Sequence, residues 1–140
     1  HVGNKASLLQ GVNLYTAQQL VTTISQTAAA VDGTPVEQLT ALMHAYRSFA
    51  HHHPNTYILA FTNNDDALRP EEDMLEQMVL PLQDLVTGVS GPENSLAALR
   101  GAMALVHGFV ILELNGQLRR GGDLAADFDA AILAYLRGWQ

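Results

Sequence analysis

The sequence has no cysteine among its 140 residues, which excludes disulfides, thiol catalysis and cysteine-ligated zinc. Charged residues make up only 15% of the chain, whereas roughly 25% is usual for soluble domains. The seven Lys and Arg are outnumbered by fourteen Asp and Glu, so the formal net charge is -7. This chain alone therefore has no basic face with which to wrap nucleic acid. The lack of cysteine fits a reducing compartment, and we expect a cytoplasmic protein.

Long apolar runs are also scarce. The longest charge-free apolar run covers residues 101–112, whereas a membrane-spanning helix needs about 20 apolar residues. We therefore expect no membrane partner. Alternation typical of strands, internal repeats and low-complexity segments are likewise missing.

The sequence does contain strong helical periodicity. Apolar residues recur every three or four positions, as in the series 14, 17, 21, 24, 28 and 31. Thr34 and Pro35 are typical of a helix start, and Asp123 is typical of another. These signals predict an all-α domain with six helices, over residues 5–31, 35–53, 55–62, 70–89, 93–115 and 124–139.

The last two predicted helices carry rows of small residues. The helix over residues 93–115 is apolar nearly all round, and such a helix needs neighbours on most of its sides. Small side chains allow a second backbone to approach, and a two-fold dimer is the usual solution. The alternative is one crowded monomeric bundle. The residues expected at the dimer interface are Ala97, Gly101, Ala104, Gly108, Ala130, Ala134 and Gly138.

Three segments resemble TetR-type transcriptional repressors. HVGNKASLLQGV at residues 1–12 is similar to the junction between the recognition helix and the long fourth helix of that family. AYRSFAHHHPNTYILAF at residues 45–61 resembles its Tyr-Arg-x-Phe-Ala and His-Pro-x-x-Tyr segment. MALVHGFVILELNG at residues 103–116 resembles the Trp-x-x-x-His-Gly segment of one C-terminal subclass, with Met103 in place of the Trp.

The resemblance implies a six-helix C-terminal regulatory domain over residues 5–140. Its last two helices would form a four-helix bundle with those of a second copy, and its core would hold a small apolar effector. Residues 1–4 would be the remnant of a DNA-binding domain, whose helix-turn-helix would precede His1 and bind the operator. His1 and Lys5 would contact the DNA backbone, where a cation near phosphate is favourable.

The candidate effector site draws on four segments that would surround a cavity. Methionine suits adaptable binding surfaces, although plain core packing is the alternative for each residue. His107 is either a packing histidine or a polar group of the pocket or dimer contact. The candidates are Met43, Tyr46, Tyr57, Phe61, Met74, Met78, Met103 and His107.

Catalytic, metal and cofactor chemistry finds little support. Consecutive helical residues point about 100° apart, so His51, His52 and His53 cannot chelate one ion. No Glu-x-x-His pair or cysteine nucleophile occurs in the sequence. We therefore expect no enzyme, metal or cofactor, and interpret the chain as part of a regulator that is typically a repressor. The alternative is a helical small-ligand carrier or interaction protein with no DNA role, and codons for a basic helix-turn-helix upstream of His1 would decide against it.

Overall fold

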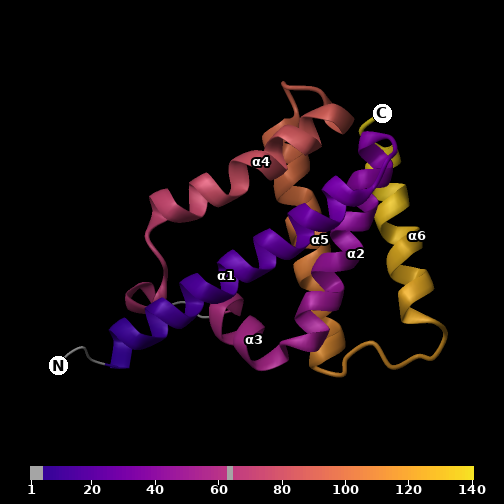
Figure 1. The fold of residues 1–140 in the computed structure, drawn as a ribbon. Helices are drawn as coiled ribbons and strands as arrows, with labels where there is room; N and C mark the ends of the chain where they lie inside the picture. Colours follow the sequence, from indigo (N-terminus) through magenta and orange to yellow (C-terminus); the bar gives the residue numbers. More distant parts are fainter. Residues whose placement is uncertain (1–4, 63–64) are drawn as a thin grey trace.

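A computed structural model of the chain describes residues 5–62 and 65–140 and shows an all-α fold (Figure 1). No strand occurs within these two ranges. The predicted fold class and the number of α-helices are confirmed. The elements are α1 (Lys5–Ala30), α2 (Pro35–His52), α3 (Pro54–Thr62), η1 (Asp66–Leu68), α4 (Glu72–Ser90), α5 (Ser95–Leu114) and α6 (Leu124–Arg137).

The predicted helix starts at α2 and α6 are confirmed. Thr34 Oγ1 accepts the backbone N–H of Glu37 at 3.2 Å, and Pro35 occupies the first turn of α2. Asp123 Oδ1 accepts the N–H groups of Ala125 and Ala126 at 3.0 and 3.2 Å. Each cap satisfies backbone donors that have no partner within the helix.

Two local expectations were wrong. The helix predicted from Pro70 begins at Glu72, and the short 3-10 helix η1 was not anticipated. Asp65 explains η1, because its side chain accepts the N–H of Ala67 and fixes a turn. Lys5 is the exposed first residue of α1, whereas His1 and the segment 1–4 lie outside the described residues.

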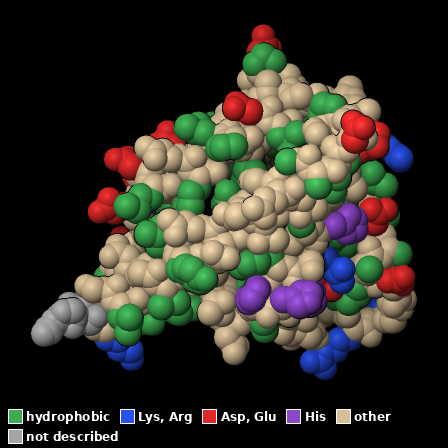
Figure 2. All heavy atoms as spheres, viewed as in Figure 1, with side chains coloured by type: hydrophobic (Ala, Val, Ile, Leu, Met, Phe, Trp, Pro, Cys, Tyr) green, Lys and Arg blue, Asp and Glu red, His purple; other side chains and the backbone are tan. Residues whose placement is uncertain are grey.

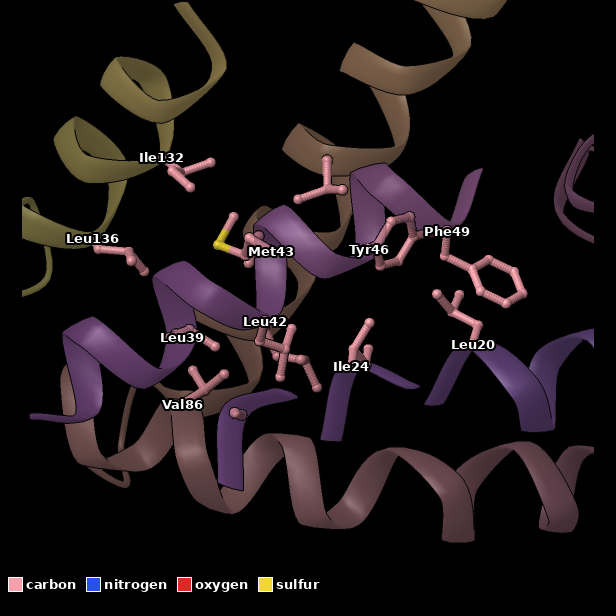
Figure 3. Packing of buried hydrophobic residues seen from close by; sticks show 14 of the residues in the cluster. Leu20, Ile24, Leu39, Leu42, Met43, Tyr46, Phe49, Val86, Ile132 and Leu136 are labelled. Atoms are coloured by element: carbon pink, nitrogen blue, oxygen red, sulfur yellow. The ribbon is translucent and has the colours of Figure 1, made fainter. Parts of the chain in front are cut away.

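Helix α2 lies at the centre of the bundle and contacts α1, α3, α4, α5 and α6. Its buried residues recur at helical spacing and include Leu39, Leu42, Met43, Tyr46 and Phe49. In Figure 3 these side chains leave α2 in several directions, toward Ile132 and Leu136 of α6 and toward α1 and α4. The core is thus built around one helix.

Helix α1 crosses the bundle diagonally (Figure 1) and buries a slightly different stripe from the predicted one. Leu20 is 3% exposed, whereas the predicted Leu14 is only half-buried. The polar residues Asn13 and Thr16 are also buried on this face. The stripe drifts because α1 packs against α2, α3, η1 and α4 at successive points along its length.

Gly101 in α5 is explained by a contact within the chain. Tyr135 of α6 crosses over it and donates its hydroxyl to the carbonyl of Ala98 at 2.8 Å. A Cβ at Gly101 would overlap the Tyr135 hydroxyl oxygen and lie 2.9 Å from Cζ. The absence of a side chain at Gly101 therefore serves α5–α6 packing inside one chain.

We expect Gly101→Ala to destabilise the fold by about 1–2 kcal/mol, because overpacking outweighs the better helix propensity of alanine. The matched control is Gly11→Ala in α1, where an added Cβ meets no described atom within 4 Å. That change should stabilise the helix by up to about 1 kcal/mol. Urea unfolding midpoints of the two variants measure both effects, and equal shifts would contradict the Tyr135 contact.

Candidate ligand-binding site

A cavity of about 400 Å³ lies between α1, α2, α4 and α5, with α3 and η1 at one end. Figure 2 shows hydrophobic side chains around the hollow between α1 and α4. Pockets of about 300–1,000 Å³ hold ligands of small-molecule size. The aliphatic and aromatic residues of its wall include Leu20, Ile24, Leu42, Met43, Tyr46, Phe61, Leu75, Met78, Val86, Leu99, Met103 and Val106.

Five predicted effector residues line this cavity. Met43 and Tyr46 come from α2, Phe61 from α3, Met78 from α4 and Met103 from α5. Four separate segments therefore contribute these residues to one cavity wall.

Met74 is the exception among the methionines. It lies one turn before Met78 on α4, is 45% exposed and is not among the described residues of the cavity wall. The first turns of α4 lie outside the core, because the buried residues of this helix are Val86 and Val89 near its far end.

Tyr57 and His107 form a second layer behind Tyr46. The hydroxyls of Tyr46 and Tyr57 lie 2.9 Å apart, and the Tyr57 hydroxyl lies 2.5 Å from His107 Nδ1. Burial raises the pKa of both tyrosines, and the neighbouring Tyr46 raises that of Tyr57 further. Burial lowers the pKa of His107. All three groups are therefore neutral at pH 7, and His107 is both a packing residue and part of a polar network.

The sequence analysis missed the α1 wall of the cavity. This wall is formed by one face of α1, through Asn13, Ala17, Leu20, Val21 and Ile24. Their spacing is helical, so the face was recognisable as buried. Nothing in the spacing distinguished a residue that faces a cavity from one that is packed.

In the described cavity wall, charged groups occur only at one end. There the exposed Asp65 and Arg69 lie close in sequence to Leu68 and Pro70. The interior is apolar apart from Asn13 and Tyr46. Such a wall favours an uncharged ligand, because an unpaired buried charge is strongly unfavourable. Within residues 5–62 and 65–140, no group of three metal-ligating side chains is assembled.

An ion pair connects two of the cavity-forming helices, α2 and α5, near their C-terminal ends. Arg47 Nε and Nη2 of α2 donate to the two carboxylate oxygens of Glu113 of α5 at 2.8 and 2.7 Å. His51 Nε2 lies 3.1 Å from Glu113 Oε1. The Arg47 guanidinium also lies 5.6 Å from the ring centre of Phe128 of α6. One arginine thereby ties α2 to both closing helices.

Burial alone raises the pKa of Glu113, but hydrogen bonds from Arg47 and His51 outweigh burial and hold it below its usual value near 4.5. A depressed carboxyl pKa contributes stability at neutral pH that is lost as the pH falls through the folded-state value. We expect Glu113→Gln to destabilise the fold by about 2–3 kcal/mol at pH 7. The difference from the native protein should shrink below about pH 4.5.

The control for this prediction is Glu93→Gln, at an exposed carboxylate on another part of the surface. Its effect should stay within about 0.5 kcal/mol at every pH. Thermal unfolding between pH 3 and 7 provides the measurement. A pH-independent loss in Glu113→Gln would show that the carboxylate charge is not what matters.

Apart from Gly101, which packs against Tyr135 within the chain, the predicted interface residues are exposed or half-buried on α5 and α6. Ala97, Ala104, Ala130, Ala134 and Gly138 are exposed and Gly108 is half-buried. An added Cβ at Gly108 meets no described atom within 4 Å, unlike one at Gly101. Large apolar side chains of α5 are exposed as well, with Leu96, Met103 and Leu112 exposed by 45, 47 and 40%.

By length and composition alone, α5 would suffice to span a membrane, with a mean hydropathy of 1.7. Only 33% of that stretch is buried within the chain. The contacts of α5 with α2, α4 and α6 are those of a bundle helix. The rest of its apolar surface is exposed to solvent in the single chain that the structure describes.

The architecture is therefore an all-α bundle with a cavity beneath a long first helix and with two apolar closing helices. A family model described as "Tetracyclin repressor-like, C-terminal domain" matches residues 39–135. The chain belongs to this family, whose members are regulatory domains and generally not enzymes.

A solved structure supports the fold. The chain is similar to a protein with unknown function from Rhodococcus sp. RHA1, with a TM-score of 0.83 and 21% sequence identity. The likeness covers 99% of this chain and 75% of the other. A search of curated proteins found no match.

Proposed function

We propose that residues 5–140 are the effector-binding and dimerisation domain of a cytoplasmic TetR-type transcriptional repressor. A small apolar molecule is the effector, and a DNA-binding domain joined through residues 1–4 reads the operator. Membership in the family supports the regulator, and the cavity supports the effector.

The size of the cavity is the observation that carries the proposal. A volume of about 400 Å³ lies within the range of about 300–1,000 Å³ that is usual for small-molecule pockets. Apolar space of this size is unfavourable when it is vacant, because the side chains around it lose packing contacts. The space is therefore one that a ligand or solvent fills, and its apolar wall favours a ligand.

Helix α1 supplies the connection from the cavity to the DNA-reading part. Asn13, Leu20 and Ile24 line the cavity, and the same helix begins at Lys5. A ligand that favours one position of α1 changes where Lys5 lies relative to a second copy. The spacing of the two DNA-reading units then no longer fits successive major grooves. The effector must bind the two arrangements with different affinity to have this effect.

Two-fold association through α5 and α6 would cover their outer faces. Exposed small residues allow close helix approach, and the exposed Leu96, Met103 and Leu112 supply apolar area to bury. With Lys5 exposed at the start of α1, the proposed contact to the DNA backbone stays accessible. The remaining proposed backbone contact, His1, lies outside the described residues.

Filling the cavity should abolish ligand binding. We expect 2-naphthol to raise the melting temperature of the native protein, with a stabilisation of about 2.7 kcal/mol at about 100 times the dissociation constant. Met78→Trp places an indole in the cavity and should remove this shift. Met74→Trp, in the exposed first turn of the same helix, should retain it. Equal shifts in both variants would count against this cavity as the effector site.

Introducing a charge into the proposed interface should separate the subunits. We expect Ala104→Arg to convert the dimer to a monomer, because the new guanidinium would be buried without a partner. Ala29→Arg is the control, since Ala29 is equally an exposed alanine within a helix, on α1. Sedimentation velocity at micromolar concentration distinguishes the two states. A dimeric Ala104→Arg variant would place the interface elsewhere.

A further inference from the structure

Two buried polar side chains lie in the otherwise apolar wall of the cavity. Tyr46 is 9% exposed and Asn13 is 2% exposed, and both line the cavity. The chemistry that a ligand meets inside depends on whether these groups present hydrogens or lone pairs. Their existing hydrogen bonds decide this.

The contact between Tyr57 and His107 favours the tyrosine hydroxyl as the donor. The separation of 2.5 Å between Tyr57 Oη and His107 Nδ1 is short for an N–H donor, whose usual range begins near 2.7 Å, and suits an O–H donor. The unprotonated nitrogen of a neutral imidazole is an acceptor, and a phenol is the more acidic partner. The single hydrogen of Tyr57 is therefore directed at His107.

As a consequence, the hydroxyl hydrogen of Tyr46 is already engaged in the hydrogen bond to Tyr57. With its own hydrogen committed, Tyr57 Oη can only accept at its 2.9 Å contact with Tyr46. Tyr46 must donate there, and it has one hydroxyl hydrogen. Its oxygen keeps a lone pair and has no hydrogen to offer the cavity.

Asn13 also has an acceptor without a partner among the described residues, but this atom has almost no accessible surface and is not offered to the cavity. Its Nδ2 donates to the carbonyl of Leu68 at 2.7 Å, which fixes the orientation of the amide. Its Oδ1 is buried and has no hydrogen-bond partner among the described residues. An unsatisfied buried acceptor is unfavourable unless a donor reaches it.

We propose that the effector is an uncharged apolar molecule bearing a hydroxyl or N–H group, which donates a hydrogen bond to Tyr46 Oη. Tyr57 and His107 are positioning residues that hold Tyr46 in its accepting state without lining the cavity. This inference rests on the proposed function, and adds the ligand class to it. Apolar ligands whose only polar group is an acceptor, such as ethers and ketones, are disfavoured.

A matched pair of probes tests the ligand class. 2-Naphthol carries a hydroxyl donor, and 2-methoxynaphthalene has the same ring system and only an acceptor oxygen. Isothermal titration of the native protein should show 2-naphthol binding about three- to tenfold more tightly, the usual effect of one hydrogen bond. Tyr46→Phe should reduce this preference, because the accepting oxygen is lost.

Variants in the second layer test the relay. Tyr57→Phe frees the Tyr46 hydrogen to turn toward the cavity, so binding of 2-methoxynaphthalene should strengthen and the preference should fall to within about twofold. His107→Leu should act in the same direction, because the Tyr57 hydrogen is then free to turn to Tyr46. Tyr15→Phe, at a 63% exposed tyrosine outside this cavity, is the control and should keep the native preference.

The outcomes separate the two proposals. If both probes bind the native protein equally well, the donor class is wrong while the cavity remains an effector site. If the preference is unchanged in Tyr57→Phe and His107→Leu, the relay does not set the state of Tyr46. If neither probe binds, the effector site and the inference built on it both fall.

Discussion

The burial of α2 on nearly all its sides is the constraint on which the rest of the structure depends. This helix contacts every other α-helix, and residues such as Leu39, Met43 and Phe49 leave it in different directions. A helix of ordinary diameter cannot bring all its neighbours into contact with one another. Helices α1 and α4 diverge where the buried residues of α4 end, and α2 forms the floor between them. The cavity is thus a consequence of packing five helices around one.

The fold was largely accessible from the sequence because its signals are local. Thr34, Pro35 and Asp123 define helix starts through hydrogen bonds to their own next turn. The buried face of α2 follows from its period alone. The same reasoning missed η1, a three-residue 3-10 helix that the side chain of Asp65 caps. It also failed for Leu14 and Leu20, because α1 changes partners along its length.

The candidate site was accessible only in part. Methionine and aromatic residues on converging segments indicated Met43, Phe61 and Met78, and these do line the cavity. Met74 has the same chemistry and local spacing, yet it faces outward, since only tertiary packing decides which turn of α4 is covered. The role of Gly101 could likewise not be predicted from the sequence, because Tyr135 lies 34 residues further along the chain and contacts Gly101 only in the folded protein.

The polar groups of the interior are few and connected. Tyr46, Tyr57 and His107 satisfy one another, and each would be unfavourable alone among apolar neighbours. Arg47 and Glu113 do the same nearer the surface, where a bidentate ion pair links α2 with α5. The packing of the other helices around α2 determines where the cavity lies. The hydrogen-bond network and the ion pair determine which polar groups lie near it.

Met103 belongs to two surfaces at once. It lines the cavity, it is 47% exposed, and it is the neighbour in sequence of Ala104, a residue of the proposed interface on α5. A second subunit covering that interface would also cover this part of the cavity wall, so a molecule inside would lose a route of escape. Effector binding and subunit association would then favour each other, and thermodynamic linkage requires the same coupling free energy in both directions. Dilution of the protein would weaken its hold on the effector even though no subunit had changed its shape.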